Sequence, residues 1–267
     1  MEYVTVSEIR DELGDEAAQL SDAAIVRRID RLSGYLEEAL GHAFGRALVA
    51  RSSDDAHTVE VTDDLLIIGG DTYPFDDYPS LGALAAAVNG AGEAYSLELL
   101  TQVHPETPSE LLKPLTATVC GGSYDRRVVL DVTAMYMRAS GDGSSHLFLP
   151  LPLQSVAAVS EDGVELAATE YSAVPGDSWI VRKYGSWSTR NAGNIVVIYT
   201  PQWWNQPPAP VKAALLEAFQ AASNLTPVVA ESFGGYSYRR VEARRASWSW
   251  QDILDLAARR YAVRWHP

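Results

Sequence analysis

The stretch SGDGSSH, residues 140–146, places an acid, a hydroxyl and an imidazole close together in the chain. Asp142, Ser144 and His146 are the residue types from which a nucleophile and its base are built. A hydrolytic triad, however, needs side chains that the fold brings together, and three near neighbours in a polar turn do not supply that geometry. Because Gly and Ser dominate this stretch, we interpret it as a hairpin loop.

Other chemical signatures are also weak. The single cysteine, Cys120, precedes a Gly pair with no histidine placed to activate it, which indicates an inert thiol and excludes an intrachain disulfide. No two histidines have the i, i+4 spacing of a helical zinc site, and the sequence contains no phosphate loop, dinucleotide fingerprint or nucleophile elbow. We therefore expect no enzyme activity, cofactor or metal. The histidines are His42, His57, His104, His146 and His266.

Paired aspartates and tryptophans leave one alternative open, a carbohydrate-active or carbohydrate-binding β domain. Two carboxylates can hydrolyse a glycoside, and tryptophans can stack on sugars. Neighbouring aspartates in a strand point to opposite faces, however, and in loops they are usually solvated. Tryptophans more often serve burial or interfaces. The residues concerned are Asp54-Asp55, Asp63-Asp64, Asp76-Asp77, Trp203-Trp204, Trp248 and Trp250.

Helical periodicity marks both ends of the chain. Near the start, a short helix is expected over Ser7–Leu13, and a longer one begins after Ser21 and ends at Gly41, with apolar residues on one face. Near the end, one helix starts at the prolines around Pro210, and another starts at a capping box formed by Ser249 and Asp252. The apolar faces of the two long helices contain Ile25, Ile29, Leu32, Leu36 and Leu40, and then Val211, Ala214, Leu215, Ala218 and Ala222.

The middle of the chain has a β signal. Runs rich in β-branched residues recur from about residue 59 to residue 200, and Asp162-Gly163 predicts a tight hairpin. We predict an α+β fold in which helical N- and C-terminal parts form a bundle and a β-rich middle carries a small helical insertion. The predicted parts are residues 1–50, residues 51–204 with the insertion at about 79–115, and residues 205–267.

Charge is distributed unevenly over the 267 residues, whose net charge is -14. Residues 1–230 contain 14 Lys+Arg and 31 Asp+Glu, a balance of -17, whereas residues 231–267 contain 7 and 4, a balance of +3. An acidic body disfavours general nucleic-acid binding, and the basic end suits an acidic protein surface. No apolar run is long enough to cross a bilayer, and the start lacks a signal-peptide pattern, so a soluble cytoplasmic product is expected.

The order of several short motifs resembles the head-to-tail connector, or adaptor, proteins of tailed double-stranded-DNA phages and related gene-transfer particles. No single motif is specific, but their order is. The resemblance covers residues 1–50 and 147–240, while residues 59–145 depart from the shorter members. After the amphipathic start, the motifs are Leu149-Pro150, Ser155-Val156, Asp162-Gly163, Tyr199-Thr200, Pro210-Val211 and Glu231 to Tyr238.

The resemblance implies a structural virion protein made in the host cytoplasm and located in the neck between capsid and tail. Its expected partners are further copies in a ring, usually a dodecamer, the portal protein, a tail-terminator or next neck protein, and double-stranded DNA in transit, with no membrane. A tail-terminator or tail-completion protein is the alternative within the neck. The expected ring interface uses Ile25, Ile29, Leu36 and Leu215. The expected portal-docking residues are Phe233, Gly234, Gly235, Tyr236, Tyr238, Arg239, Arg240, Arg244 and Arg245.

Overall fold

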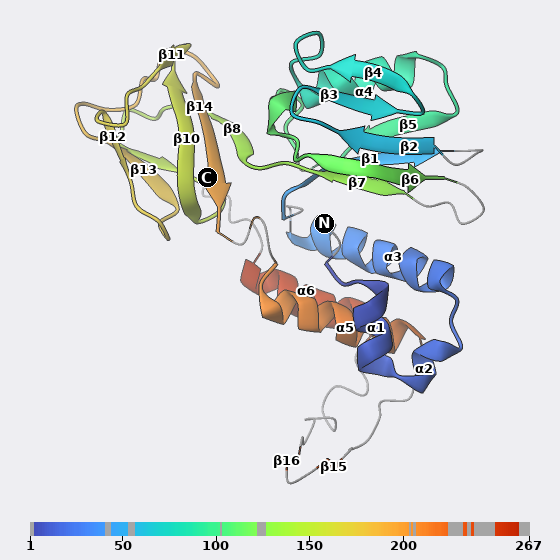
Figure 1. Cartoon of the computed structure of the whole chain (residues 1–267). Coiled ribbons are helices and arrows are strands. Elements are labelled where there is room, and N and C mark those ends of the chain that lie inside the picture. Colours follow the sequence, from blue (N-terminus) through green and yellow to red (C-terminus); the bar gives the residue numbers. More distant parts are fainter. Residues whose placement is uncertain are drawn as a thin grey trace. The chain divides into compact units, whose positions relative to one another are not determined.

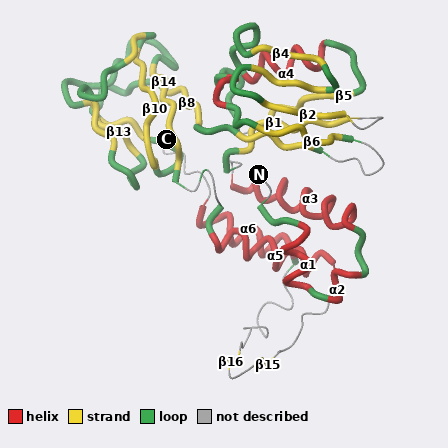
Figure 2. The backbone as a smooth tube through the Cα atoms, in the orientation of Figure 1, coloured by secondary structure: helices red, strands yellow, loops and turns green. Residues whose placement is uncertain are grey.

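The structure is a computed structural model that describes ten stretches of the chain. They are residues 3–40, 44–52, 57–101, 103–121, 127–202, 204, 207–223, 232–233, 236–237 and 249–261. The chain divides into two compact units, which we call the β unit and the helical unit. The β unit extends over residues 43–206, and the helical unit combines residues 2–42 with residues 207–262. Figures 1 and 2 show the elements of each unit.

The helical unit joins segments from both ends of the chain. Its helices are α1 (Val6–Leu13), α2 (Asp15–Ala18), α3 (Asp22–Leu40), α5 (Ala209–Ser223) and α6 (Trp250–Tyr261). Thr5 and Glu8 form a capping box that starts α1. The apolar face of α3 is buried, and α3 contacts both α5 and α6. Packing between distant segments therefore stabilises helices that would be marginal alone.

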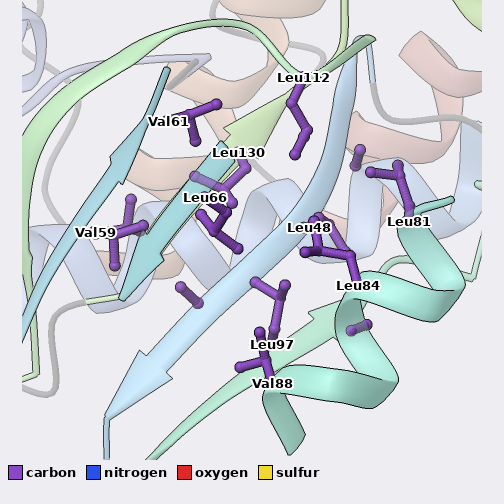
Figure 3. Close-up of a cluster of buried hydrophobic side chains, with 14 of the residues drawn as sticks. Leu48, Val59, Val61, Leu66, Leu81, Leu84, Val88, Leu97, Leu112 and Leu130 are labelled. Carbon is purple, nitrogen blue, oxygen red and sulfur yellow. The ribbon is translucent and has the colours of Figure 1, made fainter. Parts of the chain in front are cut away.

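The first lobe of the β unit contains the elements from β1 to β7. In chain order these are β1 (Arg46–Ser52), β2 (His57–Val61), β3 (Leu65–Ile68), β4 (Asp71–Pro74), α4 (Leu81–Gly90), β5 (Tyr95–Leu99), the 3-10 turn η1 (Ser109–Leu111), β6 (Leu115–Cys120) and β7 (Val128–Asp131). They form the sheets β4-β3-β2-β6 and β5-β1-β7, with antiparallel neighbours. Figure 3 shows Leu84 and Val88 of α4 beside Leu48 of β1 and Leu97 of β5, all of them buried in one core.

The second lobe of the β unit contains β8 (Met135–Ala139), β9 (His146–Phe148), β10 (Leu153–Glu161), β11 (Val164–Glu165), β12 (Tyr171–Ala173), β13 (Trp179–Arg182) and β14 (Ile195–Pro201). The sheets are β11-β10-β14-β8 and β12-β13-β9. Asp162 and Gly163 both have positive φ angles, 51° and 80°, as a two-residue type I′ turn between β10 and β11 requires. The predicted hairpin is confirmed. Trp187 and Tyr199 are at most 1% exposed in the core of this lobe.

A short pair of strands lies in sequence between α5 and α6. β15 (Ser232–Phe233) pairs antiparallel with β16 (Tyr236–Ser237), with Phe233 opposite Tyr236 and Ser232 opposite Ser237. A two-residue pair is too short to be independently stable.

The predicted fold class is wrong. We expected helical N- and C-terminal parts forming a bundle around a β-rich middle, but the described residues are β-rich, with four sheets of three or four strands. Among these residues only α3 and α5 are longer than twelve residues. Strand β1 begins at Arg46, within the range predicted to be helical. The predicted insertion at about 79–115 does contain a short helix, α4, but it also contains strand β5 and a 3-10 turn.

The physical reason for this error is the shortness of the strands. β9, β11 and β12 contain only two or three residues, too few to show a period of two along the sequence. Their pairing depends on partners elsewhere in the chain, because β9 and β12 both pair with β13. Helical periodicity is visible within a short stretch of sequence, whereas the pairing of such short strands is not. A prediction from sequence therefore overestimates the helical part of this fold.

Candidate functional site

The predicted docking segment lies between α5 and α6. Phe233 and Tyr236 occupy paired positions in β15 and β16. The other seven predicted docking residues lie outside the described residues: Gly234, Gly235, Tyr238, Arg239, Arg240, Arg244 and Arg245. The two flanking helices contact each other and α3. The helices that precede and follow the segment in sequence therefore both belong to the helical unit.

Aromatic and charged side chains hold α6 against α3. The Tyr35 hydroxyl donates to Asp255 Oδ1 at 2.9 Å, and the Tyr35 and Trp250 rings meet edge to face with centroids 5.1 Å apart. Arg31 lies over the Trp250 ring at 5.4 Å. The hydrogen bond to the Asp255 carboxylate, with burial, raises the pKa of Tyr35, so the phenol remains a neutral donor.

A capping box starts α6, as the sequence predicted. The Asp252 carboxylate accepts hydrogen bonds from the Ser249 hydroxyl at 2.8 Å and from the Ser249 backbone N–H at 2.9 Å. In return, the Asp252 N–H donates to Ser249 Oγ at 3.3 Å. These bonds lower the pKa of Asp252. The docking segment is therefore followed by a well-defined helix start.

The four predicted ring-interface residues are buried within their own helical unit. Ile25 and Leu36 are 0% exposed, Leu215 is 3% exposed and Ile29 is 7% exposed. Nothing in the structure tests their role in a ring, which stays a prediction.

An ion pair joins the first helix to α5. Lys212 Nζ donates to Glu8 Oε1, and this hydrogen bond, with the one from the Thr5 backbone, lowers the pKa of Glu8. A lowered folded-state pKa adds stability above the unfolded-state pKa of 4.5, and this stability is lost as the pH falls through the folded-state pKa. The contribution is therefore present at neutral pH and absent in strong acid.

We expect Lys212→Met to raise the pKa of Glu8 toward its ordinary value. The cost in free energy of unfolding should be below about 1 kcal/mol near neutral pH, because both side chains are more than one third exposed and solvent screens the pair. NMR titration of the Glu8 carboxyl and urea unfolding near pH 7 and near pH 2 measure both effects. An equal loss of stability at both pH values would show that Lys212 acts through packing.

The candidate triad residues do not have the geometry of a catalytic relay. Asp142 Oδ1 accepts from the Ser144 backbone N–H at 2.8 Å, and Ser144 Oγ donates to the His146 carbonyl oxygen at 2.8 Å. The hydroxyl beside the imidazole is that of Ser145, 3.1 Å from His146 Nδ1. Asp142 therefore faces Ser144, and hydrogen bonds from Ser144 lower the pKa of Asp142. The residues have the local bonding of a turn, as the Gly-Ser composition indicated. The predicted hairpin loop is wrong, because β8 and β9 on either side of this stretch belong to different sheets.

The remaining candidates from the sequence are scattered. Cys120 is buried, and its Sγ donates to the Ala50 carbonyl oxygen at 3.2 Å. Trp204 is also buried, and its indole N–H donates to the Val132 carbonyl oxygen at 2.9 Å. The exposed acidic pairs are Asp63-Asp64 and Asp76-Asp77, whereas Asp54-Asp55, Trp203 and Trp248 lie outside the described residues. Over the described ranges, no group of three or more His, Cys, Asp or Glu side chains could hold a metal ion.

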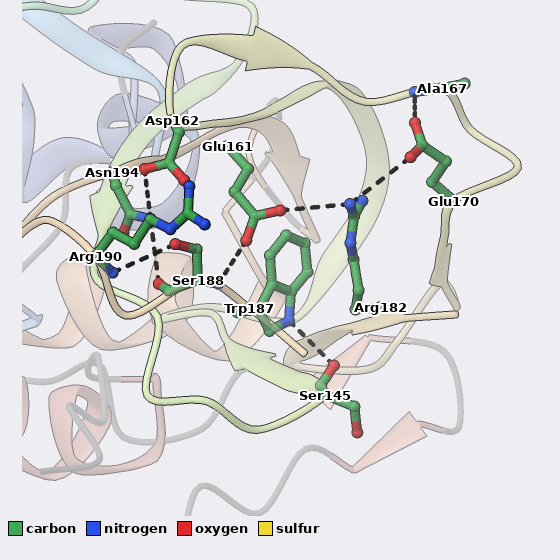
Figure 4. A network of polar contacts seen from close by, with 10 residues as sticks. All are labelled: Ser145, Glu161, Asp162, Ala167, Glu170, Arg182, Trp187, Ser188, Arg190 and Asn194. Carbon is green, nitrogen blue, oxygen red and sulfur yellow. Dashed lines mark hydrogen bonds and ion pairs between the residues drawn. The ribbon is translucent and has the colours of Figure 1, made fainter. Parts of the chain in front are cut away.

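The second lobe contains a polar network that sequence reasoning missed (Figure 4). Arg182 Nη2 lies 3.4 Å from Glu161 Oε2 and 3.7 Å from Glu170 Oε1, and the guanidinium lies 5.7 Å from the centroid of the Trp187 ring. Glu161 Oε1 accepts from the Ser188 N–H at 2.6 Å. Arg182 therefore connects the end of β10 to the loop before β12 and, through Trp187, to the loop after β13.

A second set of bonds completes this network. The Asn194 amide donates to Asp162 Oδ1 and to the Ser188 carbonyl oxygen, both at 3.1 Å. Apart from Asn194, the residues of the network line an open groove of about 650 Å³, to which Glu165 and Arg190 also contribute. The charged side chains are mostly paired within the protein, so the arrangement holds the turn after β10 and the loop before β14 in place. No local pattern reveals it, because its members are spread over about 50 residues.

Two further findings concern membrane-spanning helices and similarity to known proteins. No helix in the part of the chain that the structure describes is long and apolar enough to cross a membrane. Neither a protein-family model nor a curated protein matches the sequence.

Proposed function

We propose that this protein is a head-to-tail adaptor subunit of a double-stranded-DNA virion neck, in which the segment between α5 and α6 docks on the portal. The observation that carries the proposal is the position of the aromatic, arginine-rich segment between two helices that contact each other and α3. An aromatic segment that lies in sequence between two packed helices would give a large contact area at a limited entropic cost. The order of sequence motifs described above supports the same function.

Charge explains how such a segment selects its partner. The docking segment contains Arg239, Arg240, Arg244 and Arg245, whereas residues 1–230 have a balance of -17. Guanidinium groups bind carboxylates with two parallel hydrogen bonds, so an acidic portal surface would be preferred. The acidic body repels the phosphate backbone, which would let DNA pass without adhering.

Replacement of residues 226–247 by a short Gly-Ser linker tests the docking segment. This design keeps α6, which a simple truncation at Ala230 would remove together with its contacts to α3 and α5. We expect the linker variant to keep the helical content and unfolding profile of the natural chain and to lose co-sedimentation with portal particles. Binding by the linker variant, or no binding by the natural chain, would overturn the proposal.

A variant with fewer positive charges distinguishes specific arginine–carboxylate contacts from a general electrostatic attraction between the protein and the portal. Changing the four arginines at 239, 240, 244 and 245 to glutamine should weaken portal binding at least tenfold if two or more charge-assisted bonds are lost. The control changes Lys183 and Arg190, two exposed basic residues of the β unit, to glutamine. The control removes two positive charges and the variant removes four, so a control that loses about half as much binding free energy as the variant would mean that net charge, rather than the segment, determines binding.

A further inference from the structure

The Glu106 carboxylate joins the two lobes of the β unit. Glu106 Oε2 accepts from Arg138 Nη1 at 2.5 Å and from the Tyr136 hydroxyl at 3.2 Å. Glu106 precedes η1 in the first lobe, whereas Tyr136 and Arg138 are two residues apart on β8 of the second lobe. Residues two apart on a strand share a face, so one carboxylate can reach both donors.

Contacts within the first lobe position the Glu106 carboxylate, which is the acceptor. Thr107 donates from its N–H at 2.9 Å and from its hydroxyl at 2.6 Å to the His104 carbonyl oxygen, which closes a tight turn around Glu106. The Glu106 N–H donates to His104 Nδ1 at 3.2 Å. The His104 ring lies 5.1 Å from the Tyr136 ring, centroid to centroid. The glutamate is therefore positioned by its own lobe before it meets its partners.

Contacts within the second lobe position the Arg138 guanidinium, which is the donor, in the same way. Arg138 Nε donates to the Gly193 carbonyl oxygen at 2.8 Å. Gly193 has a φ of 67°, and a Cβ atom there would lie 3.2 Å from Arg138 Nε and 3.3 Å from its Cδ. Glycine is needed both for the backbone conformation and for the close approach of the arginine. Little side-chain entropy remains to be lost when Arg138 meets Glu106.

Further polar contacts between the lobes, within the part of the chain that the structure describes, lie close to the point where the chain crosses from one lobe to the other. Thr133 Oγ1 donates to the Leu111 carbonyl oxygen at 3.2 Å, and Trp204 Nε1 donates to the Val132 carbonyl oxygen at 2.9 Å. Arg138 lies about 15 Å further along the extended chain, at about 3.3 Å per residue. The Glu106 contacts therefore act at a distance from the crossing, where they resist rotation most effectively.

We propose that Glu106 is an electrostatic latch that fixes the second lobe against the first, and that high salt or loss of the carboxylate lets the second lobe turn about residues 132–134. The Arg138 and Glu106 side chains are 44% and 51% exposed, so counterions can reach the pair. Between such exposed charges the attraction is small and sensitive to salt. The contacts near the crossing are backbone and indole hydrogen bonds together with the apolar packing of Leu151, Trp204 and Met135 against the core of the first lobe. Salt screens these contacts far less.

Distance measurements between spin labels test the latch in the full chain. The labels are attached to cysteines introduced at Thr116 in the first lobe and at Glu165 in the second, both of which are exposed. The measurement gives the distribution of distances between the two labels. The natural Cys120 is buried and is not expected to react with the label. We expect one narrow distribution for the natural residues at low salt and a broader one at high salt. Glu106→Ala should give the broad distribution at every salt concentration.

Two further variants keep the test decisive. Glu110→Ala removes an exposed carboxylate from the neighbouring 3-10 turn and should behave as the natural chain does. Arg138→Met removes the other partner and should reproduce the effect of Glu106→Ala, so the test stands even if one variant fails to fold. A narrow, salt-independent distribution in a folded Glu106→Ala or Arg138→Met protein would overturn the latch.

Discussion

Replacing Trp187 by alanine is expected to lower the free energy of unfolding of the second lobe by about 3–5 kcal/mol, the usual cost of removing a buried tryptophan. The Trp187 side chain is 1% exposed and belongs to the core of that lobe. Its indole N–H donates to the Ser145 carbonyl oxygen at 3.0 Å, which would lose this donor. Urea unfolding, followed by hydrogen exchange of peptides from residues 135–200, measures the loss.

Trp179 provides the matched control in the same lobe. This tryptophan is 39% exposed on β13, so Trp179→Ala should change the free energy of unfolding by less than about 1 kcal/mol. Trp187 also supports Arg182, which lies over its ring between two glutamates. Equal losses from the two substitutions would mean that the packing around Trp187 does not determine the stability of the lobe.

Long amphipathic patterns predicted the helices well. The apolar spacing from Ile25 to Leu40 defines α3, the capping box at Ser249 marks the start of α6, and the proline-started pattern corresponds to α5. These signals are local, since periodicity and caps arise within a few turns. The expected short helix over Ser7–Leu13 is likewise found as α1, which starts one residue earlier at Val6.

The β part could not be predicted at the same level. β1 pairs with β5 on one side and with β7 on the other, and these partners lie about 50 and 80 residues away. Such pairing depends on register and burial in three dimensions rather than on local sequence. This is also why the fold class was assigned too much helical character. The tight turn at Asp162-Gly163 was predictable because its backbone conformation has a local cause.

The ion pairs of the β unit were equally hard to predict. The Arg182 network and the Glu106–Arg138 pair each combine charged residues from separate elements, and the sequence shows only isolated charges at these positions. The triad candidate was correctly set aside because the composition of its stretch is that of a turn. The docking segment was identified by composition and resemblance, and the structure adds that its flanking helices contact each other.

A chain that ends at Ser249, and so lacks α6, is expected to lose the cooperative unfolding of its helical unit. The truncation removes the buried side chains of Ile253, Leu254 and Ala258 and exposes the faces of α3 and α5 that α6 covers. The loss of two large aliphatic side chains alone costs about 4–10 kcal/mol, which is comparable to the whole stability of a domain. It also removes Trp250 and Asp255, the partners of Tyr35.

Hydrogen exchange of peptides from α3 measures this effect directly, with Leu256→Ala as the control. Leu256 is 45% exposed on α6, so its truncation should leave the protection of α3 unchanged. The result decides how portal-binding experiments are read, because a chain without α6 would fail to bind through unfolding rather than through loss of the docking segment. Full protection of α3 in the truncated chain would show that α1, α2 and α5 suffice to hold it, and truncation would then be a valid test of docking.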